Sequence, residues 1–287
     1  MSFSAWQFQY NGLTFGASSN VGVSQVTGLG DIAAVRSGDV ARPVDTGYLA
    51  GWDFLGQRTI TITMQVEPAD GSPGLAYDLD QVKAAFAPSQ TVELPLQFML
   101  PGQRPRIVNA RCRKLSAPID VTFEMGYAVV TVQLVASDPR IYDASPSTTS
   151  ILLPTSASGM TFPATFPLGF GGIVGSGGVG FAGNVGNVET RPVLTIAGGV
   201  CTEPFLQNLT TGETLALSLS LTATDDVTVD MDAQTVYING TGDRSSYVEP
   251  GSTFWTLQPG LNQIGFHSQD GQPTGATLTV SWRSAWL

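Results

Sequence analysis

The sequence is poor in basic side chains. Its 287 residues include 13 lysines and arginines against 23 aspartates and glutamates, which gives a formal net charge of −10. Binding to nucleic-acid phosphates or to anionic membrane surfaces requires a basic surface, so we expect neither. No stretch approaches the ~18 apolar residues that mark a membrane span, so membrane insertion is not expected. The first residues lack a basic segment followed by an apolar run, so we expect no signal peptide.

Residues that commonly carry catalysis are also few. The chain has one histidine, His267, and two cysteines, Cys112 and Cys201, and it contains no G-x-S-x-G or G-x-x-x-x-G-K sequence. A G-x-G-x-x-G match at residues 175–180 lies in a glycine-rich tract without a helix after it. Candidate zinc ligands are scattered, and two cysteines in different predicted domains indicate reduced thiols made in a reducing cytosol. We therefore predict no enzyme activity, no cofactor and no metal site.

One acidic cluster qualifies that prediction. Asp225, Asp226, Asp230 and Asp232 lie close together, and three of them share one face of a predicted strand. A solvated sheet face explains this pattern, and the spacing matches no calcium-binding loop. A metal at the cluster stays open at this stage, as does a glycosidase, which needs only two carboxylates at a set separation.

Alternation of apolar and polar side chains is the strongest pattern that is present. In residues 127–143 every even position from Ala128 to Ala136 is apolar, which predicts a strand with one buried face before Asp138-Pro139 ends it. Residues 58–67 alternate in the same way. An Asn11-Gly12 pair predicts a hairpin turn, and residues 78–86 predict a helix capped by Asp78. Residues 92–100 form another strand, which Pro95 would place at a sheet edge. Residues 1–143 thus form a β-rich domain with one short helix.

Two segments lack such a pattern. Residues 35–57 are long for a loop in a compact domain, and such loops are often functional or ordered by a neighbour. Residues 144–191 are rich in glycine, proline and phenylalanine, and we expect them to connect two domains as extended segments laid over both surfaces. Residues 192–287 return to short alternating strands and predict a β-sandwich. The fold class is therefore mainly β.

The order of these features resembles a known family, the distal tail proteins of long-tailed (siphovirus-type) bacteriophages, which are tail-tip hub or baseplate components. The resemblance covers nearly the whole chain and depends on a combination of features. These are RTITI at 58–62 after a long Gly/Pro segment and before one helix, ASDPRIY at 136–142, FP and FPLGF in the connector, RPVLTIAG at 191–198, NLTTGETL at 208–215 and WTLQPGLN at 255–262.

The resemblance implies a homohexameric ring at the distal end of the tail tube, made in the bacterial cytoplasm and located at the virion tail tip. The N-terminal domains would form the ring, and the C-terminal sandwich would have a galectin-like or carbohydrate-binding-module-like fold. Partners would be the tail-tube protein, a tail-associated hub or fibre protein, and the tape measure protein in the channel. The segment 35–57 would be the family's belt-like extension, and its candidate interface residues are Val40, Pro43, Val44, Tyr48, Leu49, Trp52 and Phe54.

A carbohydrate-binding adhesin is the alternative to a purely architectural role. Large aromatic side chains can stack on sugar rings, although in a small sandwich they more often fill the core. The candidates for saccharide contact are Tyr237, Trp255 and Trp286.

Overall fold

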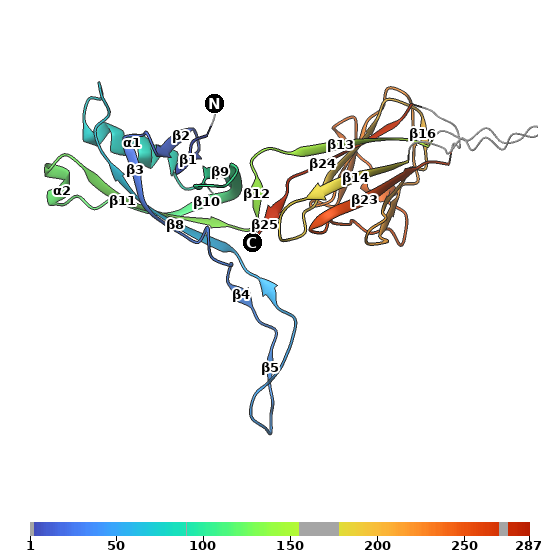
Figure 1. The fold of residues 1–287 in the computed structure, drawn as a ribbon, viewed down its shortest axis with the longest axis horizontal. Coiled ribbons are helices and arrows are strands. Elements are labelled where there is room, and N and C mark those ends of the chain that lie inside the picture. Colours follow the sequence, from blue (N-terminus) through green and yellow to red (C-terminus); the bar gives the residue numbers. More distant parts are fainter. Residues whose placement is uncertain (1–2, 90, 155–177, 270–274) are drawn as a thin grey trace, which may run out of the picture. The chain divides into compact units, whose positions relative to one another are not determined.

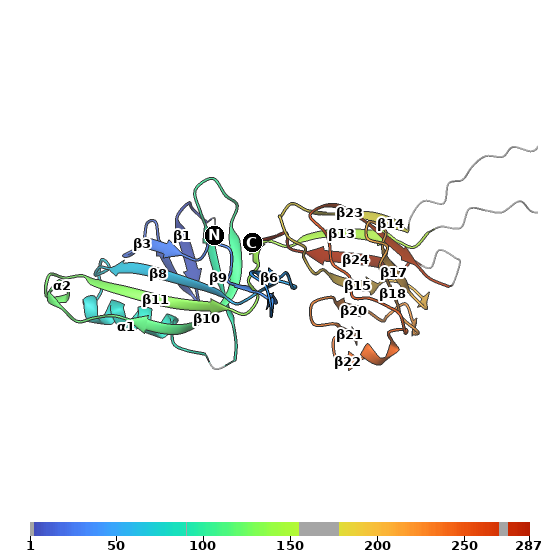
Figure 2. The ribbon, with the colours of Figure 1, turned by 90° about the horizontal axis from the view of Figure 1, so that it is seen from below.

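The computed structural model describes residues 3–89, 91–154, 178–269 and 275–287. Strands dominate both compact units of the chain, which confirms the predicted mainly β fold (Figures 1 and 2). Unit 1 comprises Met1–Ser145 together with Trp286–Leu287, and unit 2 comprises Pro146–Ala285. The expected connector aromatics Phe162, Phe166 and Phe170, and Ile173 with them, lie outside the described residues.

A single twisted sheet forms the body of unit 1. Its path is β2-β1-β9-β10-β11-β8-β3, and β12 pairs with β10 and with β25. The strands are β1 (Gln7–Tyr10), β2 (Leu13–Gly16), β3 (Val21–Thr27), β8 (Arg58–Val66), β9 (Leu94–Met99), β10 (Arg106–Ser116), β11 (Ala128–Ala136), β12 (Ile141–Asp143) and β25 (Ala285–Trp286).

The alternating strand predicted first is the central β11. Its even-numbered side chains are all buried, and Val132 pairs with Ile62 of β8, whose own even positions are buried as well. Burying a valine or isoleucine side chain stabilises the fold by about 1.5–3 kcal/mol, so this inner face accounts for the strand's regular pattern. Helix α1 (Leu75–Ala85) packs its buried residues into the same core.

Three local predictions meet different outcomes. The Asn11-Gly12 hairpin is confirmed, because both residues have positive φ between β1 and β2. The predicted helix cap is wrong, since α1 begins one turn earlier and Asp78 accepts a hydrogen bond from the amide of Ala69 (2.9 Å). The edge position of Pro95 is also wrong, because β9 lies between β1 and β10; β1 pairs only with Leu96–Met99 and does not reach the proline. A short helix, α2 (Val121–Glu124), was not predicted.

Unit 2 is a β-sandwich. One sheet has the order β13-β24-β15-β20-β21-β22 and the other β14-β23-β17-β18, with a separate β16–β19 pair. Its elements are β13 (Ser147–Leu152), β14 (Val179–Asn184), β15 (Val193–Ala197), β16 (Cys201–Thr202), β17 (Phe205–Asn208), β18 (Thr214–Ala216), β19 (Ser220–Leu221), β20 (Val227–Asp230), β21 (Thr235–Ile238), β22 (Gly242–Asp243), the 3₁₀ turn η1 (Ser245–Tyr247), β23 (Gly260–His267) and β24 (Thr277–Trp282).

Two parts of the sandwich differ from the expected pattern. Strands β13 and β14 come from the stretch expected as a connector, and they pair with β24 and β23. The stretch 215–221, in which every second residue is a leucine, is not one continuous strand. Leu215 lies in β18, which pairs with β17, and Leu221 lies in β19, which pairs with β16, whereas Leu217 and Leu219 lie between the two strands. All four leucines still point into the core, which explains why their alternation continues across the break.

Candidate functional site

The segment 35–57 is a narrow two-stranded arm that extends from the sheet of unit 1 (Figure 1). Near its base β4 (Val35–Arg36) pairs with β7 (Phe54–Leu55), and farther out β5 (Val40–Ala41) pairs with β6 (Tyr48–Leu49). Between these pairs the amide of Gly38 donates to the carbonyl of Trp52 (3.1 Å). The sequence predicted a loop without regular structure; the arm is a ribbon of short strands.

Apolar side chains cover the arm without being buried. Val44 is 96% exposed and Trp52 is 84% exposed. A two-stranded ribbon without a packed face is only marginally stable in water, and a large exposed apolar surface marks an interaction site. The remaining predicted interface residues are also exposed: Val40, Pro43, Tyr48, Leu49 and Phe54. Their role in subunit contact stays a prediction.

Close backbone approach fixes the shape of the arm. A Cβ placed on Gly51 would lie 2.1 Å from the carbonyl oxygen of Gly38, and one placed on Gly38 would lie 2.8 Å from that of Trp52. Contacts this short cannot be accommodated without moving backbone, so the two strands require glycine where they approach. The amide of Gly51 also donates to the carboxylate of Asp39 (2.8 Å), which holds the strands together beside this approach.

Arg58 anchors the base of the arm, and sequence reasoning did not single it out. The side chain is buried, and its guanidinium donates to the carbonyls of Pro139, Gly28 and Asp31, each at 2.6 Å. Burial lowers the pKa of Arg58, and nearby Asp31 and Asp138 oppose that shift. The sequence did contain a signal for its burial: Arg58 is an even-numbered position of the alternating strand β8 and shares its inward face with Ile60 and Ile62.

The structure does not bring the three saccharide candidates together. Trp255 is fully buried in the core of unit 2, so the prediction that it contacts sugar is wrong for this residue. Tyr237 lies on β21 and is 38% exposed. Trp286 belongs to unit 1, where the guanidinium carbon of Arg106 lies 4.1 Å from its ring centroid. This cation occupies one face of the ring, so a sugar could not stack on that face.

The titratable residues noted in the sequence form no catalytic set in the part of the chain that the structure describes. No group of three His, Cys, Asp or Glu residues could hold a metal within those ranges. Cys112 and Cys201 are buried and neither belongs to a disulfide, and burial raises the pKa of the Cys112 thiol. His267 ends β23 on the surface, beside the ring of Phe205.

In the acidic cluster, each of three carboxylates has a local partner. Asp225 accepts hydrogen bonds from Thr222 and Asn239, Asp230 accepts from the amides of Asp232 and Ala233, and Asp232 pairs with Arg191 (2.6 Å). These contacts cap turns and stabilise strand ends, which is the ordinary role of exposed aspartates beside a hairpin.

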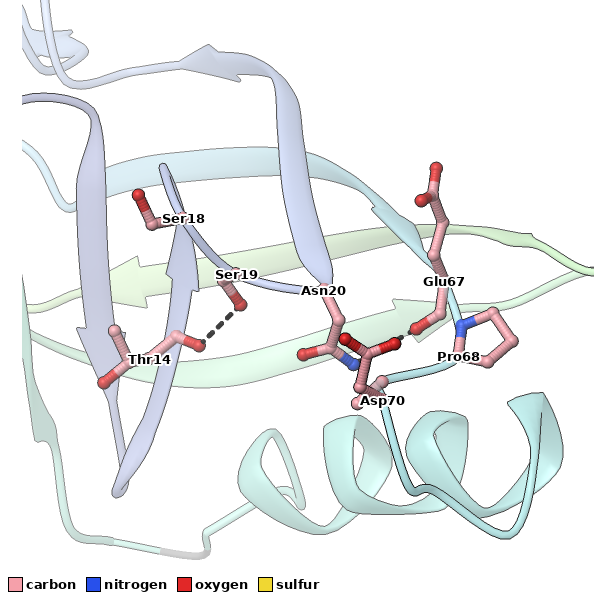
Figure 3. Close-up of a pocket in the computed structure, with 8 residues that line it drawn as sticks. Thr14, Ser18, Ser19, Asn20, Glu67, Pro68 and Asp70 are labelled. Carbon is pink, nitrogen blue, oxygen red and sulfur yellow. Dashed lines mark hydrogen bonds between the residues drawn. The ribbon is translucent and has the colours of Figure 1, made fainter.

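An open hollow of about 500 Å³ lies between the β2–β3 loop and the link from β8 to α1 (Figure 3). Its polar groups largely satisfy each other: the hydroxyl of Ser19 donates to the carbonyl of Thr14 (3.2 Å), and the side-chain amide of Asn20 donates to the carbonyl of Glu67 (3.1 Å). Glu67 and Asp70 are exposed residues, and the Glu67 carboxylate points away from the other labelled side chains (Figure 3). The hollow is thus a hydrogen-bonded junction between two loops.

Over the described residues, no helix has both the length and the apolar character to cross a membrane. The arm carries the two most exposed large apolar side chains of the described residues, Val44 and Trp52.

Comparison with known proteins agrees with this architecture. Residues 185–286 match the family model described as the C-terminal domain of the siphovirus-type tail component. The crystal structure of the Dit protein (gp 19.1) of phage SPP1, described as a paradigm of the hub adsorption apparatus in phages infecting Gram-positive hosts, is similar over 98% of this chain and 99% of its own, with a TM-score of 0.68 and 16% identity.

A chain of the phage P2 baseplate in its activated conformation with calcium is similar over 96% of this chain and 97% of its own, with a TM-score of 0.51 and 10% identity. The corresponding strontium structure gives a TM-score of 0.50 at the same identity. No curated protein matches the sequence significantly. Residues 185–286 are therefore similar to the C-terminal domain of the siphovirus-type tail component, and the whole chain has the fold of the phage tail hub protein Dit.

Proposed function

We propose that this chain is a structural virion protein that forms a ring at the distal end of a phage tail tube and joins the tube to the host-adsorption apparatus. The family match of unit 2 and the fold match over nearly the whole chain support this assignment. The matched proteins are described as parts of a hub adsorption apparatus and of a baseplate. The function is one of shape and self-association, without covalent chemistry.

The exposed arm is the observation that carries the proposal. Unit 1 leaves the apolar side chains of its own arm uncovered. In the proposed ring, the arm of one copy is covered by a surface of the next copy other than that copy's arm. Contacts between two different surfaces propagate head to tail and close into a ring when the rotation allows. Val40, Val44, Tyr48, Leu49, Trp52 and Phe54, with Pro43, would form the subunit contact.

The family resemblance sets the remaining details of the proposal. The ring would contain six copies, with the tail-tube protein on one side and a tail-associated hub or fibre protein on the other. Its channel would hold the tape measure protein and later pass DNA. The net charge of −10 suits a channel that does not retain DNA. The ring would assemble in the host cytoplasm and end at the virion tail tip.

Deleting residues 37–51 tests the role of the arm. Arg36 and Phe54, which pair between β4 and β7 at the base of the arm, can still pair after the deletion, so we expect unit 1 to fold. Because the proposed contact residues between them are mostly removed, we expect the variant to be monomeric. Light scattering should give the mass of one shortened chain, which is below the 30.1 kDa of the full chain, whereas the full chain should give six times 30.1 kDa. A deletion variant that still forms the ring would show that the arm does not make the subunit contact. A full chain that is monomeric would contradict the ring proposal itself.

A point substitution separates the arm from general surface effects. Trp52→Asp places a charge on an 84% exposed side chain, so the thermal midpoint should hardly change while assembly is lost. Tyr77→Asp on α1, at a site 52% exposed, is the matched control and should assemble normally. The proposal is contradicted if Trp52→Asp assembles as well as Tyr77→Asp, or if both variants lose assembly to the same extent.

A further inference from the structure

Arg58 joins three segments that are distant in sequence. Its Nη1 donates to the carbonyls of Gly28 and Asp31, and its Nε donates to that of Pro139. The segment 28–31 leads from β3 into the arm, and Arg58 itself follows the arm at the first residue of β8. One guanidinium therefore holds both ends of the arm.

The third partner belongs to the turn that closes unit 1. Asp138 organises this turn: it accepts from the amide of Arg140 (3.1 Å), pairs with the Arg140 guanidinium (3.5 Å) and accepts from the hydroxyl of Tyr142. The chain then passes through β12 and enters unit 2 at Pro146. Arg58 is thus hydrogen-bonded to the last turn before the chain leaves unit 1.

These contacts act as a unit because the charge is buried. Burying a guanidinium costs free energy that its hydrogen bonds offset. Nη2 of Arg58 is already buried without a partner, so the bonds from Nε and Nη1 carry that compensation and losing one of their acceptors is costly. Hydrogen bonds from a charged donor are also stronger and more directional than neutral ones. Gly28 strengthens the restraint, because its φ is +86° and a Cβ there would lie 2.0 Å from the carbonyl oxygen of Thr59.

We propose that Arg58 is a positioning residue that couples the base of the arm to the Asp138–Arg140 turn. Movement of either segment shifts a carbonyl that the same guanidinium binds, so the other segment must adjust or lose its hydrogen bond. In an assembled ring, which depends on the proposed function, a neighbour that holds the arm would thereby restrain the turn through which the chain reaches unit 2. The coupling itself exists within a single chain.

Hydrogen exchange tests the coupling by perturbing one side and observing the other. Asp138→Ala removes the organiser of the turn and a carboxylate whose charge favours the ionised Arg58, and it changes no residue of the arm. The amides to follow are those of Gly28, which donates to Asp31, and of Gly56, which donates to the carbonyl of Ala34 at the arm base. We expect both to exchange roughly tenfold faster in the full-length variant, in line with the loss of a local restraint.

Arg58→Met is the second variant, and it should raise exchange at the arm base and at the Arg140 amide together. Arg58→Lys, which keeps the charge but lacks the planar fork, should give a smaller increase at the same amides. Arg113→Met removes an exposed arginine from β10 and is the control, with no change expected at either place. A merely stabilising Arg58 would raise exchange across the whole sheet.

The outcomes are distinct. If Asp138→Ala changes exchange only at residues 138–142, the coupling is absent, even where Arg58→Met fails to fold. If the coupling is found and the full chain is monomeric, the single-chain inference stands and the ring proposal fails. If the full chain is a ring and the Gly28 and Gly56 amides are unaffected, the ring proposal stands and the coupling fails.

Discussion

At the residue scale, two glycines with nearly the same φ allow backbone strain to be separated from steric crowding. Gly28 has a φ of +86° and Gly12 a φ of +84°, but only Gly28 has a backbone atom where a Cβ would lie. Alanine at position 12 should lower the free energy of unfolding by about 1–2 kcal/mol, the cost of a left-handed non-glycine residue. Alanine at position 28 should lower it by roughly 3 kcal/mol or more.

Urea unfolding of unit 1, followed by the fluorescence of its tryptophans, would measure both losses. A similar loss in the two variants would show that the backbone beside Thr59 moves aside easily. In that case Gly28 would not constrain the corner that leads into the arm.

Asp225 gives a prediction about pH. Hydrogen bonds from the Thr222 hydroxyl, the Asn239 side chain and the Thr222 amide lower the pKa of this carboxyl from 3.8 to about 2. A carboxyl whose folded pKa is depressed stabilises the fold above its unfolded pKa and loses that contribution as the pH falls through the folded value. The stability difference between wild type and Asp225→Asn should therefore shrink between pH 4 and pH 2.

An NMR titration of the Asp225 carboxyl in the wild type and in Thr222→Val checks the cause. Valine removes the hydroxyl donor, so the pKa should rise toward its ordinary value. An unchanged pKa would assign the shift to the other donors.

Single residues are also where sequence reasoning was weakest. Trp255 and Trp286 are both tryptophans near predicted strands, but one is buried in unit 2 and the other lies under Arg106 in unit 1. Their environments depend on contacts between residues far apart in sequence. Arg58 could have been recognised, because an arginine on the inward face of an alternating strand needs acceptors that the fold must supply.

At the scale of elements, strands were predicted correctly where the burial of every second side chain gives the sequence an alternating apolar pattern. Strands β8 and β11 were predicted to within a residue or two because each second side chain enters the core. The arm gives no such signal, since both of its faces are exposed and its apolar residues follow no period. Sequence therefore indicated that residues 35–57 are unusual and apolar but not that they pair as a ribbon.

The close approach of the arm strands leads to a prediction about this element. Gly51→Ala places a Cβ 2.1 Å from the carbonyl oxygen of Gly38, so the strands must separate there. Unit 1 keeps its core, and its thermal midpoint should change little. The protein concentration at half-assembly should rise about tenfold or more, because a loosened ribbon must be ordered again on docking.

Mass photometry over a dilution series would measure that concentration. Ala50→Ser, at the neighbouring exposed position, is the control and should assemble like the wild type. Normal assembly of Gly51→Ala would mean that the partner surface tolerates a different arm shape.

At the scale of the whole molecule, the chain has two hydrophobic cores with no residue in common. One contains Leu134 of unit 1 and the other contains Leu194 of unit 2, and both side chains are fully buried. The change of composition after residue 143 indicated two domains. It did not indicate that β13, from the expected connector, belongs to the sandwich, or that Trp286 returns to unit 1, because strand pairing across more than a hundred residues leaves no local pattern.

Separate cores predict separate unfolding transitions. Replacing a buried leucine with alanine typically lowers the free energy of unfolding by about 2–5 kcal/mol through lost burial and a residual cavity. Leu134→Ala should therefore lower the transition of unit 1 alone, and Leu194→Ala that of unit 2 alone. Scanning calorimetry of the arm-deleted protein, where ring contacts would not interfere, should resolve one shifted and one unshifted transition in each variant. Because each leucine belongs to one core, a common shift of both transitions would mean that the second chain crossing, at Ala285–Trp286, makes the two units unfold as one.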